Sequence, residues 1–305
     1  MKFPFTIKSD IELGHRSTAL VVDRDADVII REGDVPDAIE SKLDGAAFQI
    51  KRGEFLHNIP DGSSLYVNDG REIIYRRGPQ TTDRDLALFI LGSAWGAVCY
   101  QRGLIPIHAS ANIADGKIVA FTGHSGAGKS TLAANLAVRG YSFFTDDTLI
   151  FDQTSNAAEA ICFAGQKQLK LWRDAIEVTG ATALHPVRQD ETVDKHFAVP
   201  PSPSDLIAAP LDRLFVITRS RNDAKEPNTI VNLKGSEALL AIRANLYRPH
   251  YAEILMGRSA LFLGLKQLAD KVKVARFVRQ TGEENYDAAL DYISAAIGPA
   301  SANAI

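Results

Sequence analysis

A glycine-rich segment holds the residue types that bind phosphate groups. Residues 123–130 read Gly-His-Ser-Gly-Ala-Gly-Lys-Ser and match the pattern G-x-x-x-x-G-K-[ST] at every fixed position. An apolar run from Ile118 to Phe121 predicts a buried strand before the segment, and apolar residues at helical spacing predict a helix after it, ending at Gly140. In such a turn the backbone N–H groups and the positive end of the helix dipole face one anionic group. The sequence therefore predicts a nucleotide-binding site.

Individual positions of this loop have separate expected roles. We expect the ammonium group of Lys129 to reach the β- and γ-phosphates of ATP, and the hydroxyl of Ser130 to bind Mg²⁺. The glycines allow the backbone to curl around the phosphates. The complete predicted nucleotide-binding set is Gly123, His124, Ser125, Gly126, Ala127, Gly128, Lys129, Ser130 and Thr131.

Two adjacent carboxylates, Asp146 and Asp147, follow the next apolar stretch along the chain, Tyr141 to Phe144. In a strand–helix–strand unit with parallel strands, this point returns to the same sheet edge as the loop. One carboxylate is expected to join the Mg²⁺ site, and the other to accept a proton from an attacking hydroxyl or to orient a water. The pair therefore predicts phosphoryl transfer chemistry beside the loop.

Composition excludes several classes of protein. The 305 residues are 46% hydrophobic and 23% charged with a net charge of −3, so nothing predicts a nucleic-acid partner. The two cysteines, Cys99 and Cys162, lie in apolar segments, which argues against a disulfide framework or zinc site and favours a cytoplasmic location. The most apolar segment, Leu86 to Tyr100, is shorter than the about 20 residues that span a bilayer. We expect a core helix there and no membrane partner.

The elements around the loop predict an α/β fold. Residues 1–82 read as short strands separated by turns, a small β-rich module without a catalytic constellation. Residues 83–305 are expected to form a phosphate-loop kinase core with a mixed sheet and flanking helices, including helices at 83–102, 235–246 and 252–270. Residues 183–212 are rich in proline and aspartate with little periodicity. They are expected to form a long loop that serves as a lid or binds substrate.

The segment from His108 to Asp147 resembles the catalytic domain of HPr serine kinase/phosphorylase and its relatives. The shared features are the interval from His108 to Gly123, the interval from Ser130 to Asp147, and the Arg-Gly ending of the helix at residues 139–140. This resemblance covers about 40 residues and combines several independently spaced motifs. It implies an ATP- and Mg²⁺-dependent kinase that acts on a serine hydroxyl.

The resemblance also implies roles for single residues. It makes Asp147 the general base that deprotonates the acceptor serine, places Asp146 near the metal, and makes His108 an active-site residue. A later basic residue is expected to join the site, and Lys195 is favoured for it, with Lys170 and Arg213 as alternatives.

One segment departs from the family pattern. Leu169-Lys-Leu-Trp172 stands where the family has an acidic, metal-associated segment, with Lys170 in place of an acidic residue. We therefore expect a one-way kinase and not a phosphorylase.

The expected phosphate acceptor is inferred from the resemblance alone. The β-rich module together with the loop resembles the kinases related to HPr kinase, some of which phosphorylate lasso-peptide precursors, so the expected partner is a peptide or small protein carrying a serine. The alternatives are a small-molecule kinase, an NTP hydrolase and a nucleotide sensor. The apolar strand Arg213 to Thr218 does not end in a carboxylate, which argues against a hydrolase. The presence of the Asp pair argues against a sensor. Apolar helices near residues 236–246 and 254–269 could supply a homo-oligomer interface.

Overall fold

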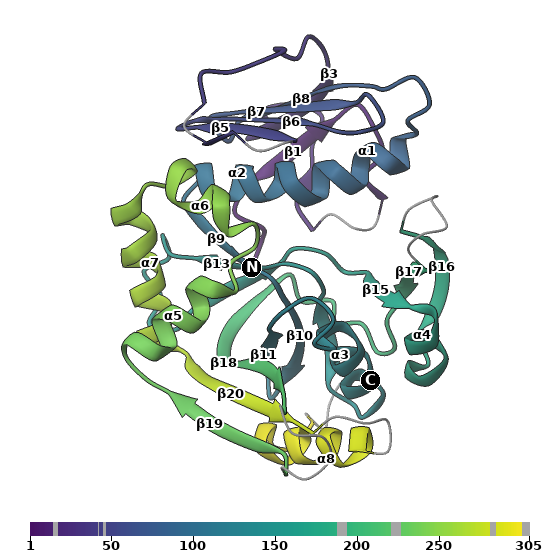
Figure 1. Ribbon diagram of the computed structural model, residues 1–305, viewed down its shortest axis with the longest axis vertical. Coiled ribbons are helices and arrows are strands. Elements are labelled where there is room, and N and C mark those ends of the chain that lie inside the picture. The colour runs from purple at the N-terminus through teal and green to yellow at the C-terminus, as the bar shows by residue number, and fades with distance from the viewer. Residues whose placement is uncertain are drawn as a thin grey trace.

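The chain is an α/β protein built in layers, as predicted (Figure 1). A computed structural model describes residues 1–14, 18–41, 43–44, 47–187, 194–220, 227–280 and 285–300. One sheet covers a long helical segment, which in turn covers a central mixed sheet, and further helices and a small third sheet flank the central one. The site described below lies at one edge of the central sheet.

The first sheet confirms the β-rich character predicted for residues 1–82. Its spatial order is β2-β1-β3-β8-β7-β6-β5-β4, with antiparallel hairpins from β4 to β8 and parallel pairs around β1 and β3. Apolar side chains alternate along its strands, as in β3, so one face is buried. The strands are β1 (Thr6–Ser9), β2 (Leu20–Val21), β3 (Val28–Glu32), β4 (Leu43–Asp44), β5 (Phe48–Lys51), β6 (Glu54–Asn58), β7 (Ser64–Asn68) and β8 (Glu72–Arg76).

The helical layer follows directly. It consists of α1 (Asp83–Phe89), a π-helical turn at Ile90–Ala94 and α2 (Trp95–Gln101), which together make the helix predicted at 83–102. The hydroxyl of Thr82 accepts from the backbone N–H of Asp85, whose carboxylate accepts from the N–H of Thr82, and this capping box fixes the start. Every residue from Ile90 to Tyr100 is buried, which confirms the predicted core helix.

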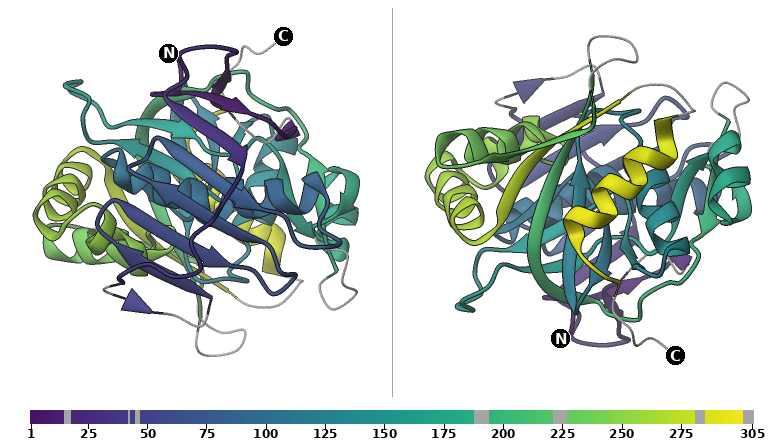
Figure 2. Two further views of the ribbon diagram at one scale, coloured as in Figure 1. Left: turned by 90° about the horizontal axis from the view of Figure 1, so that it is seen from above. Right: turned by 90° about the horizontal axis from the view of Figure 1, so that it is seen from below.

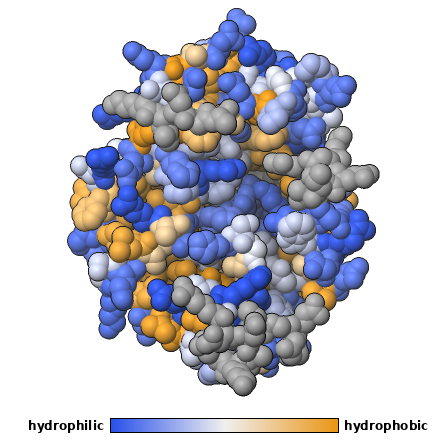
Figure 3. Space-filling view, in the orientation of Figure 1, coloured by the Kyte–Doolittle hydropathy of each residue, from blue (hydrophilic) through white to orange (hydrophobic). Residues whose placement is uncertain are grey.

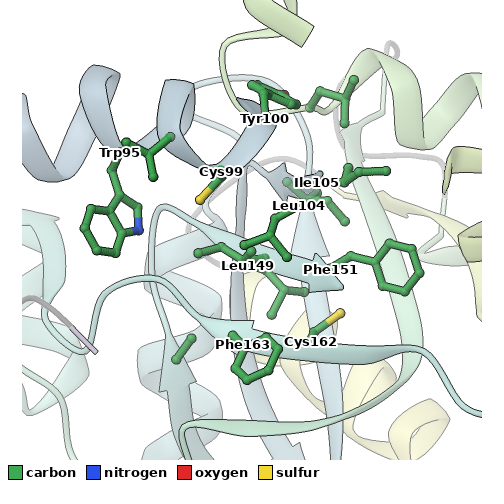
Figure 4. Packing of buried hydrophobic residues seen from close by; sticks show 14 of the residues in the cluster. Trp95, Cys99, Tyr100, Leu104, Ile105, Leu149, Phe151, Cys162 and Phe163 are labelled. Atoms are coloured by element: carbon green, nitrogen blue, oxygen red, sulfur yellow. The ribbon is translucent and has the colours of Figure 1, made fainter. Parts of the chain in front are cut away.

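The helical layer shares one hydrophobic core with both sheets. Trp95 contacts the rings of Phe3 and Phe5 on its first-sheet side. Cys99 points toward the central sheet (Figure 4). The labelled members of this core on the central sheet are Leu104, Ile105, Leu149, Phe151, Cys162 and Phe163.

The central sheet has the order β12-β10-β11-β18-β14-β13-β9, and β20 pairs with β18 and with β19. Strand β10 runs antiparallel to both β11 and β12, so β11 and β12 point the same way and end at the same edge. Strands β18 and β20 run parallel to β11 and also end there. The strands are β9 (Leu104–Ile107), β10 (Ala109–Ala114), β11 (Lys117–Thr122), β12 (Ser142–Thr145), β13 (Leu149–Asp152), β14 (Ile161–Ala164), β18 (Ala208–Arg219), β19 (Thr229–Leu233) and β20 (Lys273–Arg279).

Two helices pack on this sheet beside the glycine-rich loop. Helix α3 (Lys129–Val138) turns Leu132 and Leu136 toward the sheet and α8, and its alanines toward the third sheet. Helix α8 (Tyr286–Ile297) lies across the strands in the view from below (Figure 2). Because α3 is buried on two sides, its sequence is apolar over more than one face.

The third sheet corrects one prediction. Residues 183–212 do not form one irregular loop in the described part: β16 (Thr182–Pro186) and β17 (Lys195–Val199) lie there, and β18 begins at Ala208. Strand β17 is the middle strand of a three-stranded sheet with β15 (Leu169–Trp172), beside α4 (Arg173–Thr179). Residues 188–193 of the predicted lid lie outside the described residues.

The helices after β19 correct another prediction. The single helix expected at 252–270 is two helices, α6 (Pro249–Leu255) and α7 (Arg258–Lys271), because Gly257 has a φ of 87° between them. Helix α5 (Ser236–Ala244) agrees with its prediction. Hydrophobic colour in Figure 3 gathers over α5 and α7, where exposed side chains include Leu240 and Phe262. None of the helices in the described ranges has the length and apolar character needed to cross a membrane.

Candidate functional site

The glycine-rich loop joins β11 to α3, which confirms the predicted strand–loop–helix arrangement. Gly123 has a φ of 138°, and a Cβ on it would lie 2.6 Å from the carbonyl oxygen of Ile217 on β18, so only glycine fits. Gly126 and Gly128 have φ angles of 79° and 93°, in the left-handed region that favours glycine. The backbone of the loop is therefore fixed by its glycines and by contact with β18.

Lys129 places a buried cation at the loop. The residue is 7% exposed, and its Nζ donates to the carbonyl oxygens of Gly123 at 2.9 Å and His124 at 3.1 Å. Burial lowers the pKa of Lys129, against the opposing charges of Asp146 and Asp147. Neutral carbonyls compensate a buried ammonium group only in part, so an anion in the loop would stabilise it.

Asp146 follows β12 and faces the start of α3, as the parallel direction of β11 and β12 requires. Its Oδ1 accepts from the hydroxyls of Ser110 at 2.5 Å and Ser130 at 2.9 Å. Its Oδ2 accepts from the backbone N–H of Lys170 at 2.9 Å. At 2% exposure, this carboxylate is positioned by three donors from three separate elements.

The oxygens of Ser130 and Asp146 fit a magnesium ion. Mg²⁺ prefers oxygen ligands and keeps several waters and phosphate oxygens in its coordination shell, so one hydroxyl and one carboxylate suffice from the protein. The described residues contain no group of three His, Cys, Asp or Glu side chains that could hold a metal alone. The donor set therefore matches a metal that arrives with a phosphate ligand.

Asp147 adopts an uncommon backbone conformation for a residue other than glycine, with a φ of 67°. Its Oδ2 lies 2.7 Å from Nζ of Lys170, and its Oδ1 lies 3.4 Å from Nδ1 of His108. The same Nδ1 lies 2.9 Å from the backbone oxygen of Asp147. Burial raises the pKa of the carboxyl, but the charges of Lys170, His108 and Arg248 outweigh it and lower the pKa to about 2.

His108 links this carboxylate to the segment between α5 and α6. Its backbone N–H donates to the carbonyl of Asn245 at 2.9 Å, and its ring centroid lies 6.0 Å from that of Tyr247. Burial lowers the pKa of His108, although the carboxylate of Asp147 opposes the shift. The neighbouring Arg248 has a φ of 53° and lies over the Tyr247 ring at 5.6 Å.

The structure separates the three basic residues considered from the sequence. Lys170 pairs with Asp147. Lys195 lies on β17, with its Nζ 5.3 Å from the centre of the Trp172 ring. Its charge acts on Lys129 and contributes to the lowered pKa there. Arg213 pairs with Asp212 and donates to the backbone oxygen of Ala296 on α8. It lies opposite Val119, near the start of β11, and so outside the site.

Several residues at this edge were not predicted. Ser110 lies on β10, two residues after His108, and its hydroxyl donates to Asp146. Arg248 acts on Asp147, and Arg219 and Arg279 reach the loop, from segments that are distant in the sequence. No local pattern in the sequence marks them.

Comparison with protein-family models and with curated proteins finds no match to this chain. Among solved structures, it is similar to the HPr(Ser) kinase/phosphatase from Coxiella burnetii, at 14% sequence identity and a TM-score of 0.29. The match covers 60% of this chain and 91% of that chain. A similarity at this score carries no argument about function, which therefore has to come from the site.

Proposed function

We propose that this protein is an ATP-dependent serine kinase that transfers the γ-phosphate to a hydroxyl of a peptide or small protein. One observation carries the proposal: the carboxylates of Asp146 and Asp147 stand side by side at the loop, the first bonded to Ser130 and the second paired with Lys170. A phosphate loop alone supports only nucleotide binding. A second fixed carboxylate beside it gives an acceptor hydroxyl a place to bind.

The loop and α3 supply the donor side of the reaction. Backbone N–H groups of residues 123–130 and the ammonium group of Lys129 bind the β- and γ-phosphates. Ser130 and Asp146 hold Mg²⁺, which, when bound, neutralises charge that develops on the phosphate oxygens. Transfer of this kind depends mainly on positioning and on charge stabilisation.

Asp147 binds the hydroxyl group that accepts the phosphate. A carboxylate with a pKa of about 2 is a weak base, but it accepts a strong hydrogen bond and is ionised at every physiological pH. In a loose transition state the attacking oxygen forms little bond before the metaphosphate-like group develops, so strong basicity is not required. Asp147 therefore orients the acceptor hydroxyl and takes its proton late in the transfer.

The acceptor class rests on the motif resemblance and on the wall beside the site. The resemblance favours a serine as the acceptor residue, with a lasso-peptide precursor as one candidate substrate. The reaction would take place in the cytoplasm, where ATP is supplied. Strands β15 and β17 place Lys170, the 47% exposed Trp172 and Lys195 along one face. A strip with basic groups and an exposed aromatic ring suits an extended peptide better than a small metabolite.

The direct test is phosphate transfer from γ-labelled ATP to peptides and small proteins encoded beside the gene. We expect a phosphoserine in one acceptor by mass spectrometry with the wild type, and none with Asp147→Asn. ADP release that is equally fast without any acceptor would indicate a hydrolase. ATP binding without turnover across the whole panel would indicate a sensor.

A further inference from the structure

Two arginines approach the phosphate loop from the side opposite the Asp pair. In the central sheet β11 lies between β12, which leads to Asp146 and Asp147, and the strands β18 and β20. Arg219 is the last residue of β18, and Arg279 is the last residue of β20. Because these strands run parallel to β11, both arginines arrive at the edge that carries the loop.

Both guanidinium groups reach the glycines of the loop. Nη2 of Arg219 donates to the carbonyl oxygen of Gly126 at 2.6 Å. A Cβ built on Gly128 would lie 3.4 Å from Nη1 and 3.7 Å from Nη2 of Arg279. The Arg279 guanidinium also lies 5.4 Å from the centre of the Tyr286 ring, whose hydroxyl accepts from Asn135 of α3 at 3.1 Å.

No carboxylate of the described residues pairs with either of these two cations. Across the part of the chain that the structure describes, the buried Nε of Arg279 also has no hydrogen-bond partner. Burial lowers the pKa of Arg279, and the nearby charge of Arg219 adds to this shift. Two guanidinium groups that repel each other beside an anion-binding loop become stable together when an anion lies between them.

We propose that Arg219 and Arg279 bind the α-phosphate of the donor nucleotide. The inference rests on the proposed function, which places the γ-phosphate toward Asp147 on the β12 side of the loop. The triphosphate then has to leave the loop on its other side, where β18 and β20 end. The Asp pair and the arginine pair thereby fix the direction in which the nucleotide lies.

Calorimetric titration with ATP and with inorganic pyrophosphate tests this assignment. Pyrophosphate fills the loop but lacks an α-phosphate, so only ATP should depend on the arginines. We expect Arg219→Gln and Arg279→Gln each to raise the Kd for ATP by about 10- to 100-fold, the range for a hydrogen bond to a charged group. The Kd for pyrophosphate should change by no more than about twofold.

Arg276→Gln is the matched control, because Arg276 lies on β20 but is exposed. It should leave both affinities unchanged. Equal losses for ATP and pyrophosphate in the Arg219 and Arg279 variants would mean that the arginines shape the loop, and no loss would mean that they do not contact the donor. Either result overturns the inference. A wild type that binds ATP through the arginines but phosphorylates no acceptor would overturn only the proposed function, and one that binds no nucleotide would overturn both.

Discussion

The ammonium group of Lys170 lies 2.7 Å from the carboxylate of Asp147, and the two side chains are 16% and 17% exposed. This pair is shielded from water, so the attraction between its charges is stronger than in a surface ion pair. It opposes the effect of burial on Asp147 and helps to hold its pKa at about 2. Lys170 therefore fixes both the ionisation and the position of the carboxylate.

Lys170→Met should make transfer dependent on pH. Without the ammonium group, burial raises the pKa of Asp147 toward or above the ordinary value of about 3.8, although His108 and Arg248 still oppose it. The acidic limb of the kcat/KM profile should move to higher pH, and the maximal rate should fall by about 10- to 100-fold because the carboxylate is less well positioned. The measurement is a pH–rate profile between pH 4 and pH 9.

Lys117→Met is the control for this variant, since it removes a surface ion pair with Glu159. Its profile should coincide with that of the wild type. A Lys170→Met profile that also coincides with the wild type would contradict the role given to Lys170.

Asp147→Asn should separate transfer from nucleotide binding. Asparagine tolerates the left-handed backbone that Asp147 adopts, so the loop geometry should persist. Removing a proton acceptor typically costs about 10²- to 10⁴-fold in rate, while the Kd for ATP should change by no more than about threefold. Asp115→Asn is a matched control, because Asp115 is exposed and has a φ of 48°. Near-normal transfer by the Asp147 variant would remove this residue from the reaction.

Ser130→Ala should raise the requirement for Mg²⁺. The substitution removes one oxygen ligand but leaves Asp146 bonded to Ser110 and to the N–H of Lys170. We expect the Mg²⁺ concentration at half-maximal activity to rise about 10-fold, the order found when one metal ligand or its support is lost. Ser110→Ala changes the hydrogen bonds of the same carboxylate without removing a ligand, and its Mg²⁺ dependence should change less. Identical titrations for the two variants would show that Ser130 is not a ligand.

The sequence predicted that the loop, Ser130 and Asp146 lie close together, but it did not predict the residues that surround them. The loop, Ser130 and Asp146 belong to one strand–helix–strand unit, so their spacing along the chain determines their distance in space. The contact of Lys170 with Asp147 and that of Arg279 with Gly128 depend on strands whose pairing partners are far away in the sequence. Such contacts follow from the topology of the sheets and leave no local pattern.

In the fold, too, elements with a local sequence pattern were predicted and the others were missed. Short strands of the first sheet were predicted from turn residues and alternation, and the long buried helix from its continuous apolar run. Residues 183–212 were misread because β16 is largely exposed, so apolar residues do not alternate there. The break at Gly257 was missed because apolar residues continue on both sides of it. A domain boundary near residue 82 stays a prediction.

His57 of β6 should make the folded state sensitive to mild acid. Burial, aided by the charge of Arg248, lowers its pKa to about 4, and its Nδ1 is buried without a hydrogen-bond partner in the described structure. The unfolded chain, with a pKa of about 6.5, binds a proton before the folded chain does. Protonation of His57 therefore costs no stability above about pH 6.5. As the pH drops from 6.5 toward 4, this one group lowers the free energy of unfolding by up to about 3 kcal/mol.

His57→Phe should remove most of this pH dependence, because a phenyl ring fits beside Phe55 and Phe89 and cannot be protonated. The measurement is urea unfolding at pH 7 and pH 4.5 for the wild type, His57→Phe and a control, His250→Phe, which changes an exposed histidine. Other groups titrate in this range as well, so the informative quantity is the difference in acid sensitivity between variants. An equal loss of stability in all three proteins would mean that protonation of His57 does not oppose folding.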